Sequence, residues 1–328
     1  MKAAYIEEFG PADAIRFGEL HPPVKGPTDV LVDVIATTVN PVDTFVRSGA
    51  WRTPVTFPFI IGRDVVGTVA ATGAGAADFA VGDVVWCNSL GHGGRQGAAA
   101  EQVVVPVDRL YHLPERVSPT DAAAVLHPAA TAYLALFTHG ALRTGETVLI
   151  VGAAGNVGSA AVVLAAEAGA RVMATARSRD EEYCRGLGAE GFADYREPEL
   201  LDRCRAFAPR GFDLVVDAAG WNDVDTAVDL LAFRGRVVVL AGLRSRPVLP
   251  VGPLYLKDGS VTGFVISRAT TAELADAART LNRLLALGRL RARAVDEAPL
   301  SAAADVHARL ERGQLHGRRV LLRPGSDA

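Results

Sequence analysis

The sequence predicts an α/β protein in which a strand-rich domain is interrupted by an inserted, doubly wound domain. Residues 1–118 contain short alternating or β-branched runs separated by glycine and proline, which indicate strands. From Thr147 onward strand and helix patterns alternate, and this alternation is typical of a parallel sheet covered by helices. After residue 266 come two helices and a final strand, and we expect these to return to the first domain and complete it.

Length and composition agree with two globular domains. The chain has 328 residues, of which 49% are hydrophobic and 22% charged, so it is far from the disordered class. We place the β-rich domain at residues 1–120 and 267–328 and the inserted domain at residues 121–266. A net charge of −3 gives no support to nucleic-acid or membrane binding. Three scattered cysteines and the lack of a long apolar window predict a cytoplasmic protein.

Each element rests on a local pattern. The first domain has clear strand patterns at 30–35, 65–69, 84–86 and 102–105. Thr120 and Asp121 then supply helix-start chemistry for an alanine-rich helix over 122–137. The inserted domain has predicted strands at 147–153, 170–176, 192–195, 213–218, 236–241 and 261–266, and predicted helices at 157–168, 180–187, 198–206 and 224–233. The last predicted elements are helices at 271–288 and 302–312 and a strand at 319–323.

A glycine-containing loop lies directly between the first strand and the first helix of the inserted domain. Its sequence is Gly-Ala-Ala-Gly-Asn-Val-Gly over residues 152–158, in the position that a dinucleotide-binding fingerprint requires. Gly155 allows the backbone to approach a pyrophosphate, and Gly158 allows the helix to pack closely on the strand. The alternative is a turn that only links strand and helix. The predicted cofactor contacts in this loop are Ala153, Gly155, Asn156, Val157 and Gly158.

The end of the second strand of the inserted domain indicates which dinucleotide binds. An acidic residue is expected there for NAD, because a carboxylate accepts the ribose hydroxyls and repels a 2′-phosphate. The sequence instead has Arg177, Ser178 and Arg179, and the first acid is Asp180. Two guanidinium groups and a hydroxyl match a phosphate dianion, so we expect NADPH as the cofactor. Tyr195 either flanks the adenine or is a core or edge tyrosine.

Several short motifs in a fixed order then resemble a known family. They lie at 40–49, 62–69, 81–85, 97–101, 122–124, 131–133, 152–158 and 187–189. Together they resemble the medium-chain dehydrogenase/reductase superfamily, and within it the zinc-free, ζ-crystallin-like quinone oxidoreductase branch. The resemblance implies a partly open, GroES-like β-barrel domain with an inserted Rossmann domain. It also implies an NADPH-dependent reductase of quinones or α,β-unsaturated carbonyls that forms a homodimer through the Rossmann domains.

The zinc-dependent relatives in this superfamily use three catalytic ligands, and the resemblance places three residues of this chain at those positions. They are Asn40, Arg63 and His127, of which only the histidine is a normal zinc ligand. We therefore expect no metal. Without one, hydride transfer needs a donor for the substrate oxygen that gains charge.

Three residues are the predicted catalytic groups. Asn40 is the predicted amide donor to the substrate oxygen. Asp43 fixes the loop or pairs with a base, or it is simply an Asx turn or helix cap. His127 is the predicted proton donor, because an imidazole with an ordinary pKa near ~6.5 suits that task at neutral pH, and a structural histidine is the alternative.

The resemblance also assigns the remaining site residues. Phe45, Trp51, Arg63 and His92 are placed on the substrate side, with His92 on a mobile glycine loop over 91–97. This apolar wall suggests a hydrophobic quinone or enone. The further predicted cofactor contacts are Thr131, Gly242, Leu243, Phe264, Val265 and Arg318, the last of which is alternatively a surface residue. Two other functions remain open, an enoyl-thioester reductase and a protein that binds NADPH without turnover as a sensor.

Overall fold

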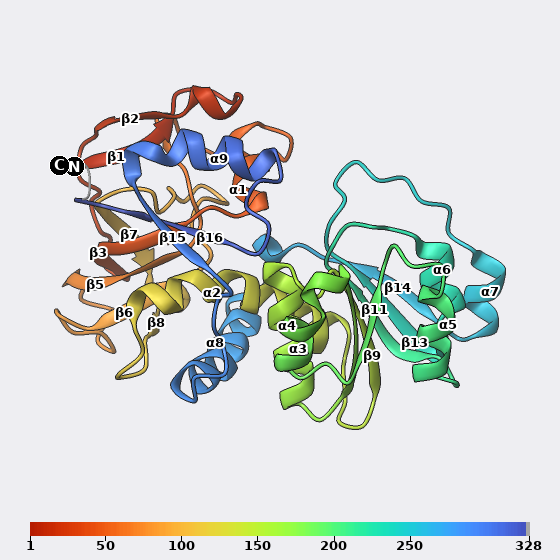
Figure 1. The fold of residues 1–328 in the computed structure, drawn as a ribbon. Helices are drawn as coiled ribbons and strands as arrows, with labels where there is room; N and C mark the ends of the chain where they lie inside the picture. The colour runs from red at the N-terminus through yellow and green to blue at the C-terminus, as the bar shows by residue number, and fades with distance from the viewer. Residues whose placement is uncertain (326–328) are drawn as a thin grey trace. The chain divides into compact units, whose positions relative to one another are not determined.

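The computed structural model describes residues 1–325, which form two compact units (Figure 1). The first unit comprises Met1–His127 and Leu274–Ala328, and the second comprises Pro128–Glu273. The chain passes into the second unit after His127 and returns to the first unit after Glu273. These two crossing points each lie a few residues beyond the boundaries after residues 120 and 266 that the sequence suggested. In the described part of the chain no helix has the length and apolar character needed to cross a bilayer.

The first unit contains two sheets. The smaller has the order β2-β1-β4, and the larger has the order β15-β16-β3-β5-β6-β8 with β7 paired to β3. Because this path ends at β15 and β8, the larger sheet is not a closed barrel, as predicted. Its strands are β1 (Lys2–Ile6), β2 (Arg16–Glu19), β3 (Asp29–Thr38), β4 (Phe59–Ile60), β5 (Val65–Thr72), β6 (Val84–Cys87), β7 (Gln102–Pro106), β8 (Tyr111–His112), β15 (Val295–Pro299) and β16 (Arg319–Arg323).

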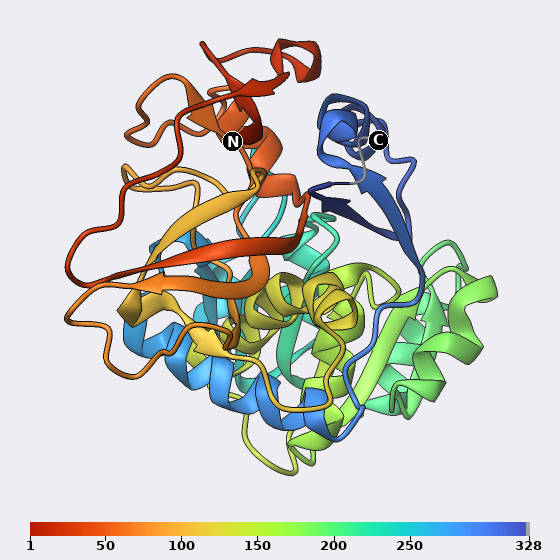
Figure 2. The same ribbon diagram turned by 90° about the vertical axis from the view of Figure 1, so that its left-hand side faces the viewer.

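The C-terminal segment completes the first unit. Strand β16 pairs antiparallel with β3, with Leu321 opposite Thr38 and Leu322 opposite Thr37. Figure 2 shows this dark-blue strand returning to the N-terminal part of the chain. The helices outside the inserted unit are α1 (Pro41–Arg47), α2 (Pro119–Tyr133), α8 (Thr271–Ala286) and α9 (Ala303–Glu311), of which α2 and α8 extend past the crossing points. The predicted return of the chain to its first domain is confirmed.

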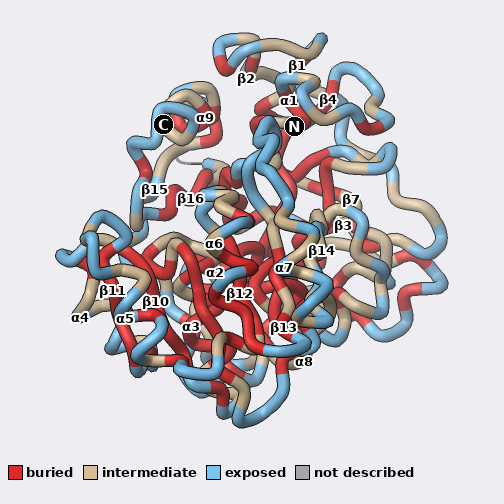
Figure 3. The backbone as a smooth tube through the Cα atoms, turned by 90° about the vertical axis from the view of Figure 1, so that its right-hand side faces the viewer, coloured by how far each residue is buried: buried red, intermediate tan, exposed pale blue. Residues whose placement is uncertain are grey.

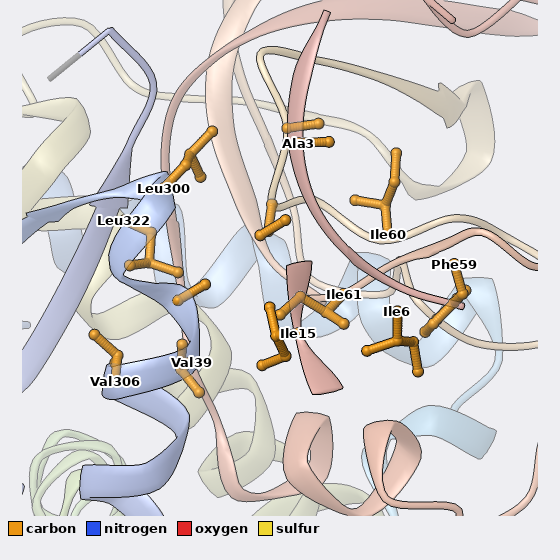
Figure 4. Close-up of a cluster of buried hydrophobic side chains, with 14 of the residues drawn as sticks. Ala3, Ile6, Ile15, Val39, Phe59, Ile60, Ile61, Leu300, Val306 and Leu322 are labelled. Carbon is orange, nitrogen blue, oxygen red and sulfur yellow. The ribbon is translucent and has the colours of Figure 1, made fainter. Parts of the chain in front are cut away.

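Two apolar cores hold the first unit together. One lies between β1, β4 and the segment that leads into α9, where Ile6, Phe59, Leu300 and Val306 are buried in contact (Figure 4). The other lies against β3 and β5, and alternate residues of β3 face it because side chains of a strand alternate between its two faces. These cores fix the ends of β3 and β4, from which the polar site described below extends.

The second unit is a doubly wound parallel sheet with the order β11-β10-β9-β12-β13-β14. Its central strand is buried along its whole length, as a strand covered on both faces must be. Figure 3 shows largely buried strands beside the more exposed α7. The strands are β9 (Thr147–Val151), β10 (Arg171–Ala176), β11 (Gly191–Asp194), β12 (Phe212–Asp217), β13 (Leu231–Val239) and β14 (Ser260–Gly263). The helices are α3 (Asn156–Glu167), α4 (Glu181–Gly186), α5 (Leu200–Phe207), α6 (Val224–Asp229) and α7 (Val251–Leu256).

Some predicted boundaries are wrong. The helix expected at 224–233 ends at Asp229, because Leu231 already pairs with Phe212 and a register shift follows in β12. The helix expected at 122–137 continues from α2 into a π-helical turn over Leu134–His139. Helices α1 and α7 and strand β15 were not predicted, because each is too short to show a clear period.

Buried His307 predicts a loss of stability in acid. Neither ring nitrogen of this α9 residue has a hydrogen-bond partner among residues 1–325, and burial lowers its pKa from 6.5 to about 3. In the unfolded chain His307 binds a proton below pH 6.5, whereas in the folded chain it binds one only below about pH 3. The free energy of unfolding therefore falls as the pH falls from 6.5 to about 3. From pH 7 to pH 5 the expected loss is about 2 kcal/mol.

Urea unfolding at pH 7 and at pH 5 measures this change in the free energy of unfolding. His307→Leu should remove this part of the pH dependence, whereas His21→Leu, at an exposed position, should leave it unchanged. An identical acid dependence in His307→Leu and the parent protein would show that His307 does not carry the effect.

Candidate functional site

The first unit contains a buried polar cluster at the ends of its strands. We define this polar cluster as Thr38, Asn40, Asp43, Arg63, Asp64, His127 and Arg319, all of which are buried. They come from the end of β3, the start of α1, the segment between β4 and β5, the middle of α2 and the start of β16. Two carboxylates and two guanidinium groups in one buried place must compensate each other, since an isolated buried charge is costly.

Both polar atoms of the Asn40 side chain, Nδ2 and Oδ1, make hydrogen bonds. It caps α1, and its amide nitrogen Nδ2 donates to Asp64 Oδ1 at 3.0 Å and to Asp43 Oδ2 at 3.3 Å. Its Oδ1 accepts a hydrogen bond from Arg319 Nη2 at 3.0 Å. Both amide hydrogens are thus directed at carboxylates. Donation to a substrate, the role predicted from the sequence, would require Asn40 to leave one of them.

Asp43 acts as a helix cap, which is one of the two roles the sequence left open. Its Oδ2 accepts from the Asn40 backbone amide at 2.8 Å and completes a capping box with Asn40 at the start of α1. Burial raises the pKa of Asp43 to about 7, while the neighbouring Arg63 opposes this rise. Asp43 is therefore a weaker acid than an ordinary aspartate.

Arg63 is a buried cation with little direct compensation. Its Nε lies 3.9 Å from Asp43 Oδ1, and none of its three nitrogens has a hydrogen-bond partner among residues 1–325. Burial lowers the pKa of the guanidinium, and Asp43 and Asp64 act in the opposite direction. The positive charge of Arg63 also lowers the pKa of the neighbouring His127.

His127 lies inside α2, within the helix that the sequence predicted, and is followed by Pro128. Its pKa is held well below the ordinary value, first by burial and then by Arg63 and Arg319, and a hydrogen bond with the Asn88 backbone opposes this only partly. The imidazole is therefore neutral at neutral pH. The argument from an unperturbed pKa does not hold, but a neutral imidazole can still donate its N–H.

Thr38, Asp64 and Arg319 are members of the polar cluster that the sequence analysis did not predict as site residues. In place of Arg319 the sequence singled out the neighbouring Arg318, which is exposed and donates to Asp296. Arg319 instead points inward and donates to four oxygens of the first unit. No local signal separates the two adjacent arginines, because Arg318 precedes β16 and the first four residues of β16 are all buried.

Three predicted substrate-side residues gather near one loop of the first unit. The Trp51 and His92 rings lie 5.2 Å apart between centroids, and the Trp51 amide donates to the Phe45 carbonyl at 3.0 Å. The glycine loop that carries His92 is fastened, because the Gly93 amide donates to Thr53 Oγ1 at 2.9 Å. That the loop is mobile stays a prediction.

In the second unit the glycine loop has the geometry of a phosphate-binding turn. It joins β9 to α3, with Gly155 as the residue before the helix, so the predicted strand-turn-helix context is confirmed. A Cβ on Gly158 would lie 2.1 Å from the Gly152 carbonyl oxygen, so only glycine fits there. Ala153, Asn156 and Val157 stand in this same turn. The free amides at the start of the 12-residue α3 suit an anion.

The basic segment after β10 is organised by a carboxylate that the sequence analysis did not single out. Arg177 Nε donates to the Tyr195 hydroxyl at 3.0 Å, which brings two predicted contacts together. Ser178 donates to Asp194 Oδ2 from its amide at 2.7 Å and from its hydroxyl at 2.5 Å. The Ser178 hydroxyl is thus engaged with Asp194, so the guanidinium groups of Arg177 and Arg179 remain the main phosphate-binding candidates.

The other predicted cofactor contacts lie in several places. Leu243, just after Gly242, follows β13 and is exposed, and Phe264, just before Val265, follows β14 and stacks on His139 at 4.4 Å. These positions are at the carboxyl edge of the parallel sheet, where ligands of such sheets bind. Thr131 is buried in α2. At the same edge Asp217 accepts from four successive backbone amides and holds a loop that carries exposed Trp221, which the sequence analysis did not identify.

The polar cluster does not fit a zinc ion. Asn40 uses its amide nitrogen on two carboxylates, and Arg63 places a cation where a ligand would be needed. Among residues 1–325 no group of three or more His, Cys, Asp and Glu side chains is placed to hold a metal ion. That the protein works without a metal stays a prediction.

Both units match known protein families. Residues 26–115 match the family model of the alcohol dehydrogenase GroES-like domain, and residues 156–283 match that of zinc-binding dehydrogenases. The chain is 31% identical over 312 residues to a Mus musculus protein named quinone oxidoreductase, covering 94% of this chain and 93% of that one. A human protein of the same name is 29% identical over 328 residues, covering 98% of each chain.

Solved structures of proteins with similar sequences have the same fold. A Pseudomonas syringae quinone oxidoreductase superposes with a TM-score of 0.86 at 28% identity, covering 98% of this chain and 99% of that one. A mycobacterial protein described as complexed with NADPH superposes with a TM-score of 0.84 at 29% identity, covering 99% of this chain and 100% of that one.

Proposed function

The chain belongs to the medium-chain dehydrogenase/reductase superfamily as an oxidoreductase of the quinone-oxidoreductase type, and from this premise we propose that it transfers hydride from NADPH to a quinone or an α,β-unsaturated carbonyl. The observation that carries the proposal is the pairing of the Gly158 phosphate turn with the Arg177–Tyr195 contact on one sheet edge. Steady oxidation of NADPH in the presence of either acceptor is the experiment that tests it.

The residues of the second unit fit a dinucleotide phosphate. When bound, NADPH supplies the hydride. The backbone amides of the turn at Gly155 and the start of α3 would hold the pyrophosphate. Arg177, fixed by Tyr195, would meet the 2′-phosphate with two or more charge-assisted hydrogen bonds. The NADPH described for a similar mycobacterial protein supports this choice of cofactor.

The residues of the first unit fit an apolar carbonyl substrate. The side chains of Phe45, Trp51 and His92 would exclude water and bind a hydrophobic ring. The neutral imidazole of His127 would donate a hydrogen bond to the oxygen that gains charge, and solvent would supply the proton that completes the reduction. Three free, buried cysteines suit a reducing compartment, and the cytoplasm is part of this proposal.

Arg177→Ala should separate the two nicotinamide cofactors. Charge-assisted contacts to a phosphate contribute roughly 1.5–3 kcal/mol, so the unmodified protein should bind NADPH at least about tenfold more tightly than NADH. Arg177→Ala should weaken NADPH binding while NADH binding stays nearly constant, as measured by fluorescence titration. Arg196→Ala, which alters a neighbouring arginine over the Tyr195 ring, is the matched control. An equal loss for both cofactors would mean that Arg177 supports the fold or the pyrophosphate.

We further propose that the protein is a homodimer joined through its second units. Strand β14 is an edge strand of the parallel sheet, and edge strands are normally covered. The nearby α7 and the segment before it expose large apolar side chains, including Val248 at 82% and Leu256 at 71%. Such a contiguous run of exposed apolar residues is typical of a protein interface.

A charged α7 should break this dimer. The double variant Tyr255→Glu/Leu256→Glu should shift the mass measured by light scattering from dimer to monomer. Val24→Glu, which alters the 93% exposed Val24 of the first unit, should not change the mass. A monomeric unmodified protein at micromolar concentration, or a double variant that stays dimeric, would contradict the proposed interface.

A further inference from the structure

Arg319 connects separate segments of the first unit from its buried position at the start of β16. Its Nε donates to the Ala124 carbonyl at 3.0 Å and its Nη1 to the Val39 carbonyl at 3.3 Å. Its Nη2 donates to Thr38 Oγ1 at 2.5 Å and to Asn40 Oδ1 at 3.0 Å. One guanidinium thus fastens α2, the end of β3 and the residue that caps α1.

The acceptor in α2 exists because of a proline. In an α-helix the carbonyl of residue i accepts from the amide of residue i+4. For Ala124 that residue is Pro128, which has no N–H, so the Ala124 carbonyl loses its helical partner. Arg319 supplies the missing donor. The contact also places the cation one helical turn from His127, which precedes the proline.

The same guanidinium decides which way the Asn40 amide faces. Arg319 can only donate, so the Asn40 oxygen must face it and the Asn40 nitrogen must face Asp64 and Asp43. Thr38 is oriented in the same manner, because it accepts from Arg319 and therefore donates to Asp64 Oδ2 at 2.5 Å. The result is a directed chain of hydrogen bonds that ends on the carboxyl group of Asp64.

We propose that Arg319 is a positioning residue of the reduction site, acting through Asn40 and Thr38 to hold the start of α1 in its working orientation. This inference rests on the proposed function. The charged groups that interact with Asp64 are Arg319 from β16, Asp43 from α1 and Arg63 from its own segment. Of these, Arg319 has the closest cationic contact to Asp64, with 3.9 Å between Nη2 and Oδ2.

Removal of the Arg319 guanidinium should change the pKa of Asp64, which a loss of side-chain packing alone would not do. Burial raises the pKa of Asp64, and Arg319 is the largest effect that opposes the rise. Without Arg319 the carboxylate should take up a proton at higher pH. Protonated Asp64 no longer accepts equally from Thr38 and Asn40, so the orientation of the Asn40 amide is lost as the pH falls.

The test compares three variants in steady-state kinetics over pH, with NADPH and the quinone or enone that the unmodified protein reduces. Arg319→Met should lower kcat by about 30-fold or more and move the acid limb of the kcat/KM profile upward by about one pH unit, with the NADPH dissociation constant within about twofold. Arg319→Lys, which keeps the charge without the planar fork, should restore the acid limb while kcat stays below that of the unmodified protein.

Arg323→Met is the matched control, because Arg323 lies at the other end of β16 and donates to Glu297 of β15, and it should change neither readout. If Arg319→Met does not fold, as judged by NADPH titration, the Arg319→Lys and Arg323→Met pair carries the test, and equal kcat values in that pair would overturn the proposal. A folded Arg319→Met with an unmoved acid limb would also overturn it. Absence of turnover in the unmodified protein would instead defeat the proposed function.

Discussion

Replacing Gly158 with alanine is expected to weaken NADPH binding by roughly 10²-fold or more, because the phosphate turn cannot accommodate a side chain at this position. The added Cβ would lie 2.1 Å from the Gly152 oxygen and 2.9 Å from Ala153 Cα. Both neighbours are backbone atoms, so the loop itself must move, and the amides that face the pyrophosphate move with it. Fluorescence titration with NADPH and with NADH measures the effect, and both cofactors should lose affinity equally.

The control is Gly186→Ala. Gly186 ends α4 in the same unit, and a Cβ added there meets nothing within 4 Å. This variant should bind NADPH as the unmodified protein does. If Gly158→Ala binds NADPH with unchanged affinity while remaining folded, then the glycine turn is only a connection between β9 and α3, which is the alternative that the sequence left open.

Replacing His127 with alanine is expected to lower turnover on an enone by roughly 10²-fold, as removal of a hydrogen-bond donor to a developing oxyanion does, with little change in NADPH affinity. The requirement should be weaker for a quinone, because its reduced oxygen is a less basic phenolate that solvent can protonate. Burial and the nearby guanidinium groups keep the pKa of His127 well below its ordinary value. The donor is therefore the neutral ring, and protonation of His127 should not limit the rate near neutral pH.

The comparison of the two substrates is the informative part of this experiment. His21→Ala, which alters an exposed histidine, should leave turnover on both acceptors unchanged. A folded His127→Ala protein with near-parental turnover on enones would show that the imidazole is structural. The hydrogen bond to the developing oxyanion would then come from solvent or from the cofactor ribose.

The second unit was the more predictable part of the fold because its signals are local. A fully buried strand such as β9 shows as an apolar run, and the turn at 152–158 has its glycines within one stretch of sequence. The boundary between α6 and β13 was misplaced, because only one residue separates the helix end at Asp229 from the strand start at Leu231. Local patterns do not resolve so short a junction.

The polar cluster was less predictable because its contacts are distant in sequence. Asn40 and Arg319 are separated by 279 positions, and no local pattern announces that they meet. The choice of Arg318 over Arg319 was a one-residue error along β16, where four successive residues are buried and alternation is obscured. Nor does a sequence reveal burial, which is what lowers the pKa of His127 and raises that of Asp43.

The most direct measurement of the proposed reaction follows the hydride itself. The protein is mixed with NADPH that carries deuterium at the transferable position of the nicotinamide, and with an enone, in unlabelled water. Hydride transfer predicts one deuterium on the β-carbon of the reduced product, detected by mass spectrometry, together with an equal amount of oxidised cofactor. A parallel reaction with a quinone should oxidise the cofactor as well. If NADPH binds saturably but neither acceptor oxidises it, or if the reduced enone carries no deuterium, then the protein is a cofactor-binding sensor or uses another reaction, and hydride transfer from NADPH is wrong.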